Sequence, residues 1–146
     1  MNKVLEFLKH NIGRTLGEYA PPFSRFLNGT IEEAEEGRLV MRFRCEPAML
    51  NPAGLMHGGV HASIIDEMTG LLVASLNTEH LYVSHNLYVD FFGKVREGEE
   101  VRAEARLVKQ GRTVINTECH IYNSEGRLVS RGVCNLVNTG QPKVIG

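Results

Sequence analysis

The sequence predicts an α+β fold in a single domain that spans residues 1–146. Two strand-like segments come first, one long apolar helix follows, and four strand-like segments then succeed one another without a helical crossover. Strands that follow one another in this way pair antiparallel, and the helices cover one face of their sheet. We therefore expect about six strands in a mainly antiparallel sheet, packed on one long helix.

The N-terminal segment predicts a short amphipathic helix over residues 2–10, where Val4, Leu5 and Leu8 fall on one side. Glycines and the pair Pro21-Pro22 interrupt this pattern, so residues 11–28 are irregular or carry another short helix. We expect this segment to cap the sheet, and the alternative is that it packs against one end of a bound substrate.

A hairpin is predicted next, with strands over Thr30–Glu35 and Arg38–Cys45 and a turn at Glu36-Gly37. In its second strand, apolar residues alternate with arginines. After the long helix, His80–Phe92 also alternates, which predicts a strand with one face on the core, formed by Leu81, Val83, Leu87, Val89 and Phe91.

Three more strands are predicted in a meander, over residues 101–109, 113–123 and 127–137. Their connections, at Gln110-Gly111 and at residues 123–126, have the composition of hairpin turns. A sheet of this kind leaves edge strands, and edges favour pairing with a second copy.

The long helix is predicted over residues 60–76, with one apolar stripe formed by Ile64, Ile65, Met68, Leu71, Leu72 and Leu76. We expect this helix to be buried. Asp66 then requires an explanation, because removing a carboxylate from water is costly unless a partner compensates it. The residues one turn away from Asp66 are mostly small, including Gly59, Ser63 and Gly70, so another group should approach that face.

The start of this helix predicts a site for negative charge. Gly58 and Gly59 leave the first amides without side chains that cover them. An ester or thioester carbonyl placed there would have its developing oxyanion stabilised, whereas the simpler reading is a tight turn. Asp66 lies about 12 Å from Gly58 along the helix axis, too far for one helix to supply both groups. Two helices packed antiparallel about a twofold axis would bring them together.

Composition excludes several functions. The net charge is −1, which gives no overall attraction to nucleic acid, and no apolar run approaches the length of a membrane span. The N-terminus is amphipathic, unlike the charged stub and apolar region of a signal peptide. We therefore expect a cytoplasmic protein that binds neither nucleic acid nor membrane. Cys45, Cys119 and Cys134 are far apart and are read as reduced core thiols. His57 and His61 have a spacing that zinc ligands use, but without the glutamate of HExxH no metal site is expected.

The run Asn51-Pro-Ala-Gly-Leu-Met-His57-Gly58-Gly59, followed by Asp66 and by Ser84 near the next strand, resembles the hotdog-fold acyl-CoA thioesterases of the PaaI and THEM2-like type, the 4HBT superfamily. The resemblance covers residues 37–137. It implies a sheet wrapped around the central helix, a homodimer that forms the active site, and a dimer of dimers. The implied substrate is an acyl- or aryl-CoA thioester, with no separate cofactor because CoA is part of the substrate.

Site residues are carried over from the same resemblance. Asp66 is implied as nucleophile or general base, with Gly58 and Gly59 as oxyanion donors. Asn51 and His57 are implied to orient the substrate carbonyl and the water, and Ser84 to place that water. The coenzyme contacts implied by position are Arg96 and the turn Lys109, Gln110, Gly111, Arg112 and Thr113.

Two departures from the family pattern bear on substrate choice. His85-Asn86 follow Ser84 where an apolar residue and an acid are usual, and Gly93-Lys94 replace a Ser-Pro pair. A noncatalytic acyl-CoA-binding protein remains an alternative. A hotdog hydratase or dehydratase is a weaker one, since neither a GHFPxxP-type loop nor an HTD-like segment occurs.

Overall fold

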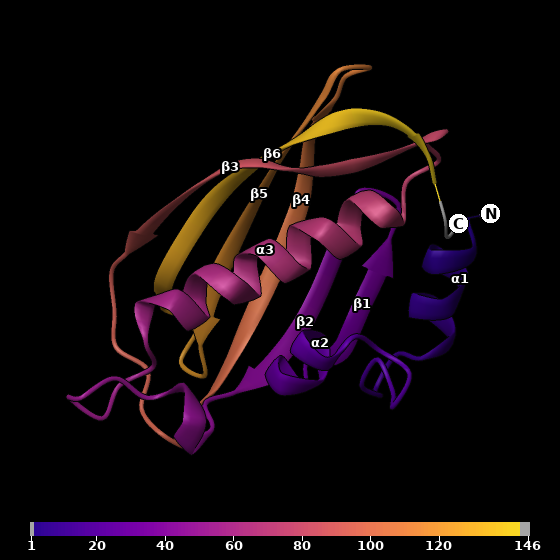
Figure 1. The fold of residues 1–146 in the computed structure, drawn as a ribbon. Coiled ribbons are helices and arrows are strands. Elements are labelled where there is room, and N and C mark those ends of the chain that lie inside the picture. The colour runs from indigo at the N-terminus through magenta and orange to yellow at the C-terminus, as the bar shows by residue number, and fades with distance from the viewer. Residues whose placement is uncertain (1, 144–146) are drawn as a thin grey trace.

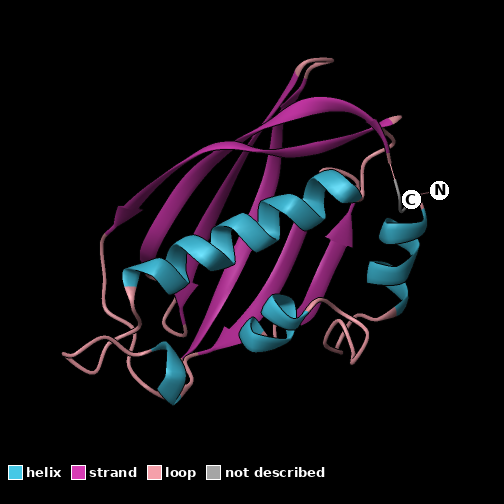
Figure 2. Cartoon of the chain, viewed as in Figure 1, coloured by secondary structure: helices cyan, strands magenta, loops and turns pink. Residues whose placement is uncertain are grey.

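One long helix lies across the concave face of a curved six-stranded sheet (Figure 1). The computed structural model describes residues 2–143. Every neighbouring strand pair is antiparallel, in the order β1-β2-β4-β5-β6-β3. Figure 2 shows that the strands bend around the helix. The predicted α+β class, the six strands and the wrapped arrangement are confirmed.

The elements follow the predicted order. The helices are α1 (Lys3–His10), α2 (Pro22–Leu27), the short 3₁₀ turn η1 (Pro47–Met49) and α3 (Gly58–Ala74). The strands are β1 (Thr30–Glu35), β2 (Arg38–Arg44), β3 (His80–Phe91), β4 (Glu100–Gln110), β5 (Val114–Asn123) and β6 (Leu128–Pro142). The largest difference in bounds is at β6, which continues five residues beyond its predicted end at Val137.

The N-terminal segment is fastened to both the core and the end of α3. Leu5 and Leu8 of α1 are buried with the main core, and Leu27 of α2 joins them. The Asn2 side chain caps α1, and its Nδ2 donates to the carbonyl oxygen of Leu76 at 3.0 Å. The same Nδ2 also donates to the carbonyl oxygen of Ala74 at 3.3 Å, one of the carbonyls that the end of α3 leaves open.

Four residues of the predicted stripe form the buried face of α3, whereas Leu71 is only half-buried and Leu76 is buried beyond the end of the helix at Ala74. Ile64, Ile65, Met68 and Leu72 have no exposed surface, and they pack against the inward side chains of β2, β4 and β5. Met41, Phe43, Ala103 and Ala105 contribute from the strands. The three cysteines are buried and unpaired, with burial raising the pKa of the Cys45 and Cys119 thiols.

The predicted core face of β3 is wrong in its first half, and Phe91 at its other end is also 55% exposed. Leu81 and Val83 are 37% and 43% exposed, whereas Tyr82 packs against buried residues. The cause is a β-bulge: Ser84 pairs with Leu136 and Asn86 with Asn135, so His85 is an extra residue. An extra residue reverses the alternation that follows it. Tyr82 and Ser84 before the bulge therefore share the helix-facing side with Leu87 after it.

No helix within residues 2–143 is long and apolar enough to cross a membrane.

Candidate active site

The centre of the site is a hydrogen-bonded pair between α3 and β3. The Ser84 hydroxyl donates to Oδ1 of Asp66 at 2.7 Å, and Sγ of Cys134 on β6 lies 3.6 Å behind Oγ of Ser84. The bulge at His85 makes this contact, because without it Ser84 would share the outer face with Asn86. Sequence reasoning found Asp66 and Ser84 but assigned Cys134 only to the core, since the sequence carries no clear signal of the bulge.

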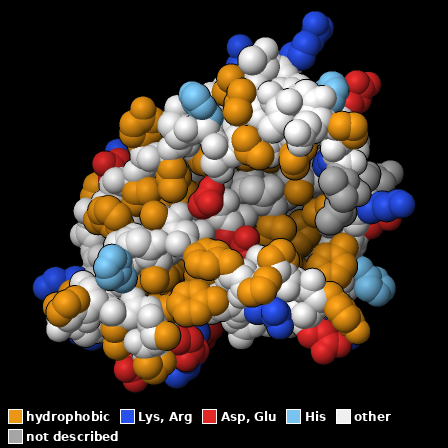
Figure 3. Space-filling view, viewed as in Figure 1, with side chains coloured by type: hydrophobic (Ala, Val, Ile, Leu, Met, Phe, Trp, Pro, Cys, Tyr) orange, Lys and Arg blue, Asp and Glu red, His pale blue; other side chains and the backbone are white. Residues whose placement is uncertain are grey.

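Asp66 is exposed in the single chain, so the prediction that it lies in a fully buried helix is wrong for one protomer. The helix is buried only on its sheet side, and Asp66 lies on the open side. Figure 3 shows this open face, with acidic side chains near its centre and hydrophobic side chains above and below them. A carboxylate in water with one neutral hydroxyl donor remains available for chemistry.

At the N-terminus of α3, one of the two predicted amide donors is already engaged. Nδ1 of His57 accepts from the amide of Gly59 at 2.9 Å, which makes His57 the N-cap of the helix. The amide of Gly58 has no acceptor among residues 2–143. A Cβ at Gly58 would lie 3.3 Å from the Phe91 ring, so glycine keeps the approach to this amide open.

The loop before the helix is shaped by Asn51. Its Oδ1 accepts from the amides of Ala53 at 2.9 Å and Leu55 at 3.1 Å, which closes a compact turn. Leu55 in turn bridges to Arg96, and the amide of Met56 donates to the carbonyl oxygen of Val95 at 2.7 Å. The structure thus gathers Asn51, His57, Gly58 and Arg96 at one end of α3.

The basic turn belongs to the other end of the sheet. Residues 109–113 form the β4–β5 hairpin, and Tyr82 donates from its hydroxyl to the carbonyl oxygen of Arg112 at 2.8 Å. Arg96 lies before the opposite end of β4, a strand of 11 residues, so about 35 Å separates the two groups at 3.4 Å per residue. One chain therefore presents three separate clusters. They are the Asp66 pair, formed by Asp66 and Ser84; the glycine end, formed by Gly58 and Gly59 with Arg96 nearby; and the hairpin at residues 109–113.

The sequence did not predict that His61, next to the glycine end, is a buried structural residue. His61 is 3% exposed, its Nδ1 lies 2.8 Å from Oγ of Ser130, and its ring meets Phe91 edge-on. Burial lowers the pKa of His61 below its ordinary value. His57 and His61 thus have separate partners, and no group of three or more potential metal ligands gathers within residues 2–143.

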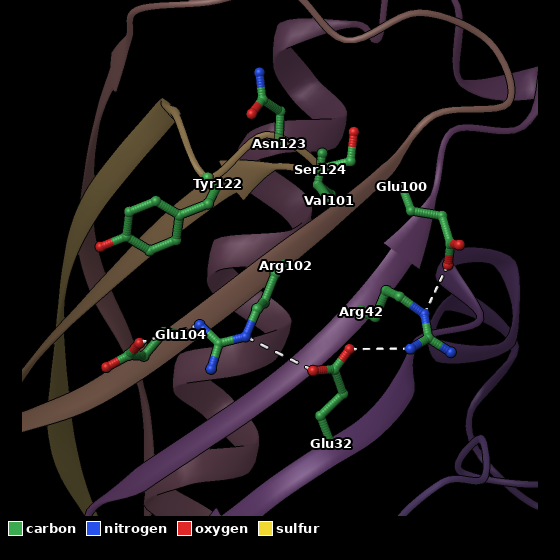
Figure 4. Close-up of a pocket in the computed structure, with 10 residues that line it drawn as sticks. Glu32, Arg42, Glu100, Val101, Arg102, Glu104, Tyr122, Asn123 and Ser124 are labelled. Carbon is green, nitrogen blue, oxygen red and sulfur yellow. Dashed lines mark hydrogen bonds and ion pairs between the residues drawn. The ribbon is translucent and has the colours of Figure 1, made fainter.

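A hollow of about 490 Å³ lies on the side of the sheet away from α3 (Figure 4). Arg42 bridges Glu32 and Glu100, and Arg102 reaches Glu32 and Glu104. Burial alone would raise the pKa of Glu104, but hydrogen bonds from Arg106 and Arg38 outweigh it and hold the pKa below its ordinary value. The charges of this hollow are therefore paired with one another.

Comparison with known proteins decides the family. The family model described as "Thioesterase superfamily" matches residues 53–130, more than half of the chain. The chain belongs to the thioesterase superfamily. The match includes Gly58, Asp66 and Ser84, and it ends at the partner of His61, Ser130.

Curated relatives within the superfamily are similar at modest identity. Human acyl-coenzyme A thioesterase 13 is 24% identical over 104 residues, which cover 70% of this chain and 74% of the relative. The medium/long-chain acyl-CoA thioesterase YigI of Escherichia coli is 29% identical over 123 residues, with 73% and 79% covered.

Solved structures agree with the hotdog fold of the superfamily. The E. coli PaaI protein from the phenylacetic acid degradation operon superposes with a TM-score of 0.80 at 18% identity, covering 96% of this chain and 99% of its own. A hypothetical thioesterase of Streptococcus pneumoniae TIGR4, solved with coenzyme A, gives a TM-score of 0.74 at 28% identity, with 81% and 94% covered.

Proposed function

We propose that this protein hydrolyses an acyl- or aryl-CoA thioester to the free acid and CoA. The observation that carries the proposal is the Asp66 carboxylate, exposed on the open face of α3 and held by Ser84. The superfamily and the names of the relatives support a thioester as the substrate.

Asp66 can act in two ways, and both consume one water. As a nucleophile it attacks the thioester carbon to form an anhydride, which water then hydrolyses. As a general base it takes a proton from a water that attacks the same carbon. In either case the C–S bond breaks and the sulfur leaves as the CoA thiol. The hydroxyl of Ser84 restricts the carboxylate to one orientation.

The oxyanion is assigned to the Gly58 amide of a partner subunit. Asp66 and Gly58 of one chain are about 12 Å apart along α3, so a second, antiparallel helix must supply the amide. Gly59 would contribute only if the His57 ring turned away from its amide, and we assign His57 to shaping this end of the helix. Asn51 holds the loop from which the amide projects.

Two features favour a homodimer that completes the site. β3 is an edge strand with exposed apolar side chains, including Val83 and Tyr88. Such an edge is a template for pairing with a second copy. The open face of α3 lies next to this edge (Figure 1), so one association would cover both surfaces. We propose a homodimer of this kind, assembled further into a dimer of dimers.

The two basic groups can then serve one coenzyme from different subunits. Arg96 accompanies the glycine end, whereas the hairpin with Lys109 and Arg112 is tied through Tyr82 to the strand that carries Ser84. In an antiparallel pair, the glycine end of one subunit meets the Asp66 side of the other. Cations and free amides of this kind suit the phosphates of CoA.

The experiment follows thiol release from a panel of aryl-, short-chain and long-chain acyl-CoA esters in buffer that contains EDTA. We expect turnover with at least one ester, and Asp66→Asn should lower it by about 10²-fold or more, with little change in affinity. Glu67→Gln is the matched control, because it removes the neighbouring charge on the same helix, and it should keep wild-type turnover.

Near-wild-type activity of Asp66→Asn would remove this residue from the mechanism. Binding of the esters without turnover by the wild-type protein would instead favour the noncatalytic acyl-CoA-binding alternative. Activity that is lost in EDTA and restored by zinc would show that the hydrolysis depends on a metal.

A further inference from the structure

Three consecutive carbonyl oxygens of the β4–β5 turn, those of residues 111–113, are held from β3 and β6. The hydroxyl of Tyr82 donates to the carbonyl oxygen of Arg112 at 2.8 Å, and the carbonyl oxygen of Gly111 lies 3.4 Å from the same hydroxyl. Nδ2 of Asn138 also donates to the carbonyl oxygen of Arg112, at 3.1 Å. The backbone amide of Asn138 donates to the carbonyl oxygen of Thr113 at 2.9 Å. Tyr82 and Asn138 are paired residues of β3 and β6, so they act on the turn together.

This arrangement leaves two consecutive amides of the turn without a partner. In a trans peptide unit, the carbonyl group and the N–H of the next residue point in opposite directions. Because the carbonyls of Gly111 and Arg112 face Tyr82, the amides of Arg112 and Thr113 face away from it. Neither amide has an acceptor among residues 2–143, and both residues are exposed. Successive free amides of a turn form a site that attracts anions.

The same turn carries two cations. Lys109 and Arg112 are both exposed. None of the ion pairs formed within residues 2–143 involves either side chain. They differ in this from Arg42 and Arg102 on the outer face of the sheet, which are paired with glutamates. Free amides beside unpaired cations suit the charge and the acceptor oxygens of a phosphate group.

The shape of the turn is fixed before any ligand binds. The ring of Tyr82 packs against a buried cluster that includes Leu76 and Leu136, so its hydroxyl is presented from a supported position. The amide of Gly111 donates to the carbonyl oxygen of Val114 at 3.0 Å, and a Cβ at Gly111 would lie 2.5 Å from that oxygen. Glycine therefore permits the tight closure of the turn. A site that is already in its binding conformation loses less conformational entropy when a ligand binds.

Tyr82 also connects the turn to the carboxylate. It lies two residues before Ser84 and shares its face of β3, because both residues precede the bulge. Ser84 in turn donates to Asp66. A group bound at the turn is therefore held relative to Asp66 through one short stretch of strand.

We propose that Tyr82 and Asn138 are positioning residues for the coenzyme. They hold the carbonyls of the turn on one side, so that the amides of Arg112 and Thr113 face outward and bind a phosphate group of CoA. The inference rests on the proposed hydrolysis of a CoA thioester and on the assignment of this hairpin to the coenzyme. It adds the backbone atoms that bind the phosphate and the side chains that orient them.

The test uses Tyr82→Phe, which removes only the hydroxyl. The substrates are the CoA ester that the wild type hydrolyses fastest and the pantetheine thioester of the same acyl group, which has no nucleotide and no phosphate. We expect KM for the CoA ester to rise about fivefold, the scale of one lost hydrogen bond, with kcat unchanged. Both constants for the pantetheine thioester should stay at wild-type values. Asn138→Ala removes the second side-chain donor to the same carbonyl and should act in the same direction.

The matched control is Tyr122→Phe, which removes the hydroxyl of a tyrosine that lines the hollow on the other side of the sheet (Figure 4). This variant should keep the wild-type KM for both thioesters. Equal losses on both thioesters in Tyr82→Phe would give Tyr82 a general structural role and overturn the inference. An unchanged KM for the CoA ester in a folded Tyr82→Phe protein would also overturn it.

A binding experiment separates this inference from the proposed function. If the wild type hydrolyses no ester, the proposed function fails, and calorimetry then compares the affinity of free CoA for the wild type and for Tyr82→Phe. Amide NMR of the wild type follows Arg112 and Thr113 as CoA is added. We expect weaker binding by the variant and shifted resonances for both amides. Equal affinities, or two amides that do not respond to CoA, would overturn the inference.

Discussion

His61 links the acid stability of the protein to one buried side chain. Burial disfavours its charged form and lowers its pKa below the ordinary 6.5. The hydroxyl of Ser130 and the Phe91 edge are the groups that meet this ring, from β6 and β3. The imidazolium would also stand one turn from the positive end of α3, where a cation is unfavourable.

The sign of the pH effect follows from this direction. Below about pH 6.5 the unfolded state binds a proton at His61 that the folded state resists, so stability falls as pH falls toward the folded pKa. We expect the free energy of urea unfolding to decline more between pH 7.5 and pH 5.5 for the wild type than for His61→Asn. The other titrating groups are common to both proteins, and parallel pH curves would contradict the assignment.

At the scale of single residues, the sequence predicted which residue types form the candidate site better than it predicted their burial and hydrogen bonds. Asp66 was identified because an acid interrupts an apolar helix, and its hydroxyl partner Ser84 came from the family resemblance. The occupied amide of Gly59 was not predicted, because it depends on a side-chain rotamer of His57. The pairing of His61 with Ser130 joins residues 69 positions apart, a separation that no local pattern records.

The contact between α3 and β6 sets how closely the helix approaches the sheet. Gly132 lies against Ile65, and an added Cβ would meet Cγ2 of Ile65 at 2.9 Å and the carbonyl oxygen of Tyr88 at 3.0 Å. A methyl group there must push apart two packed elements, one of them through its backbone. The spacing of the helix that carries Asp66 therefore depends on this glycine.

Two glycine-to-alanine changes should have opposite effects. Gly132→Ala is expected to lower the free energy of unfolding by about 1–3 kcal/mol through overpacking. Gly70→Ala should raise it by about 0.5–1 kcal/mol, because alanine favours the helix and meets nothing within 4 Å. Denaturant unfolding of both variants against the wild type measures the difference. If both changes shift the free energy of unfolding in the same direction, either Gly132 is not tightly packed or Gly70 does not face open space.

At the scale of elements, periodicity predicted each strand and the long helix but could not predict irregularities within them. The hairpin at Glu36-Gly37 and the turn at Gln110-Gly111 were predictable because turn residues separate clear alternating runs. The bulge at His85 was not, since Leu81, Val83, Leu87 and Val89 keep an even spacing, and the three consecutive polar residues at 84–86 do not show that one of them is an extra residue. The extension of β6 was also missed, because residues 138–142 lack apolar alternation and pair with the start of β3.

At the scale of the whole molecule, the proposed site, shared between two chains, predicts complementation between inactive variants. Asp66→Ala lacks the carboxylate, and Asn51→Ala combined with Gly58→Val damages the oxyanion end. Each homodimer should be nearly inactive. A heterodimer has one site with both defects and one site with neither, so equal mixing after joint unfolding should restore about a quarter of wild-type activity.

Differential tags on the two variants report how much heterodimer has formed, and melting curves report whether each variant folds. The quarter assumes independent sites and equal assembly of the two variants. If tagged heterodimer is abundant and the mixture stays inactive, the antiparallel helix pairing has to be abandoned.

The sequence predicted a dimer because of the distance between Asp66 and Gly58 along the helix, and not because of any surface feature. The 12 Å between Asp66 and Gly58 follows from helical rise alone. The exposed β3 edge and the open face of α3 supply the surfaces that such an association requires. Which side chains meet across the twofold axis depends on packing between two curved sheets, and one chain's sequence does not encode that as a periodic signal.

The extra residue in β3 also bears on how such a site can be gained or lost. A substitution at His85 leaves the number of residues between Tyr82 and Leu87 unchanged, so Ser84 continues to face Asp66. Deletion of any one residue in this short stretch would remove the bulge and turn the strand before it over, placing Leu81 and Val83 against the helix. Along this strand, the hydroxyl partner of Asp66 therefore depends on residue count as well as on the identity of Ser84, and a one-residue insertion or deletion here would separate the two side chains without changing either.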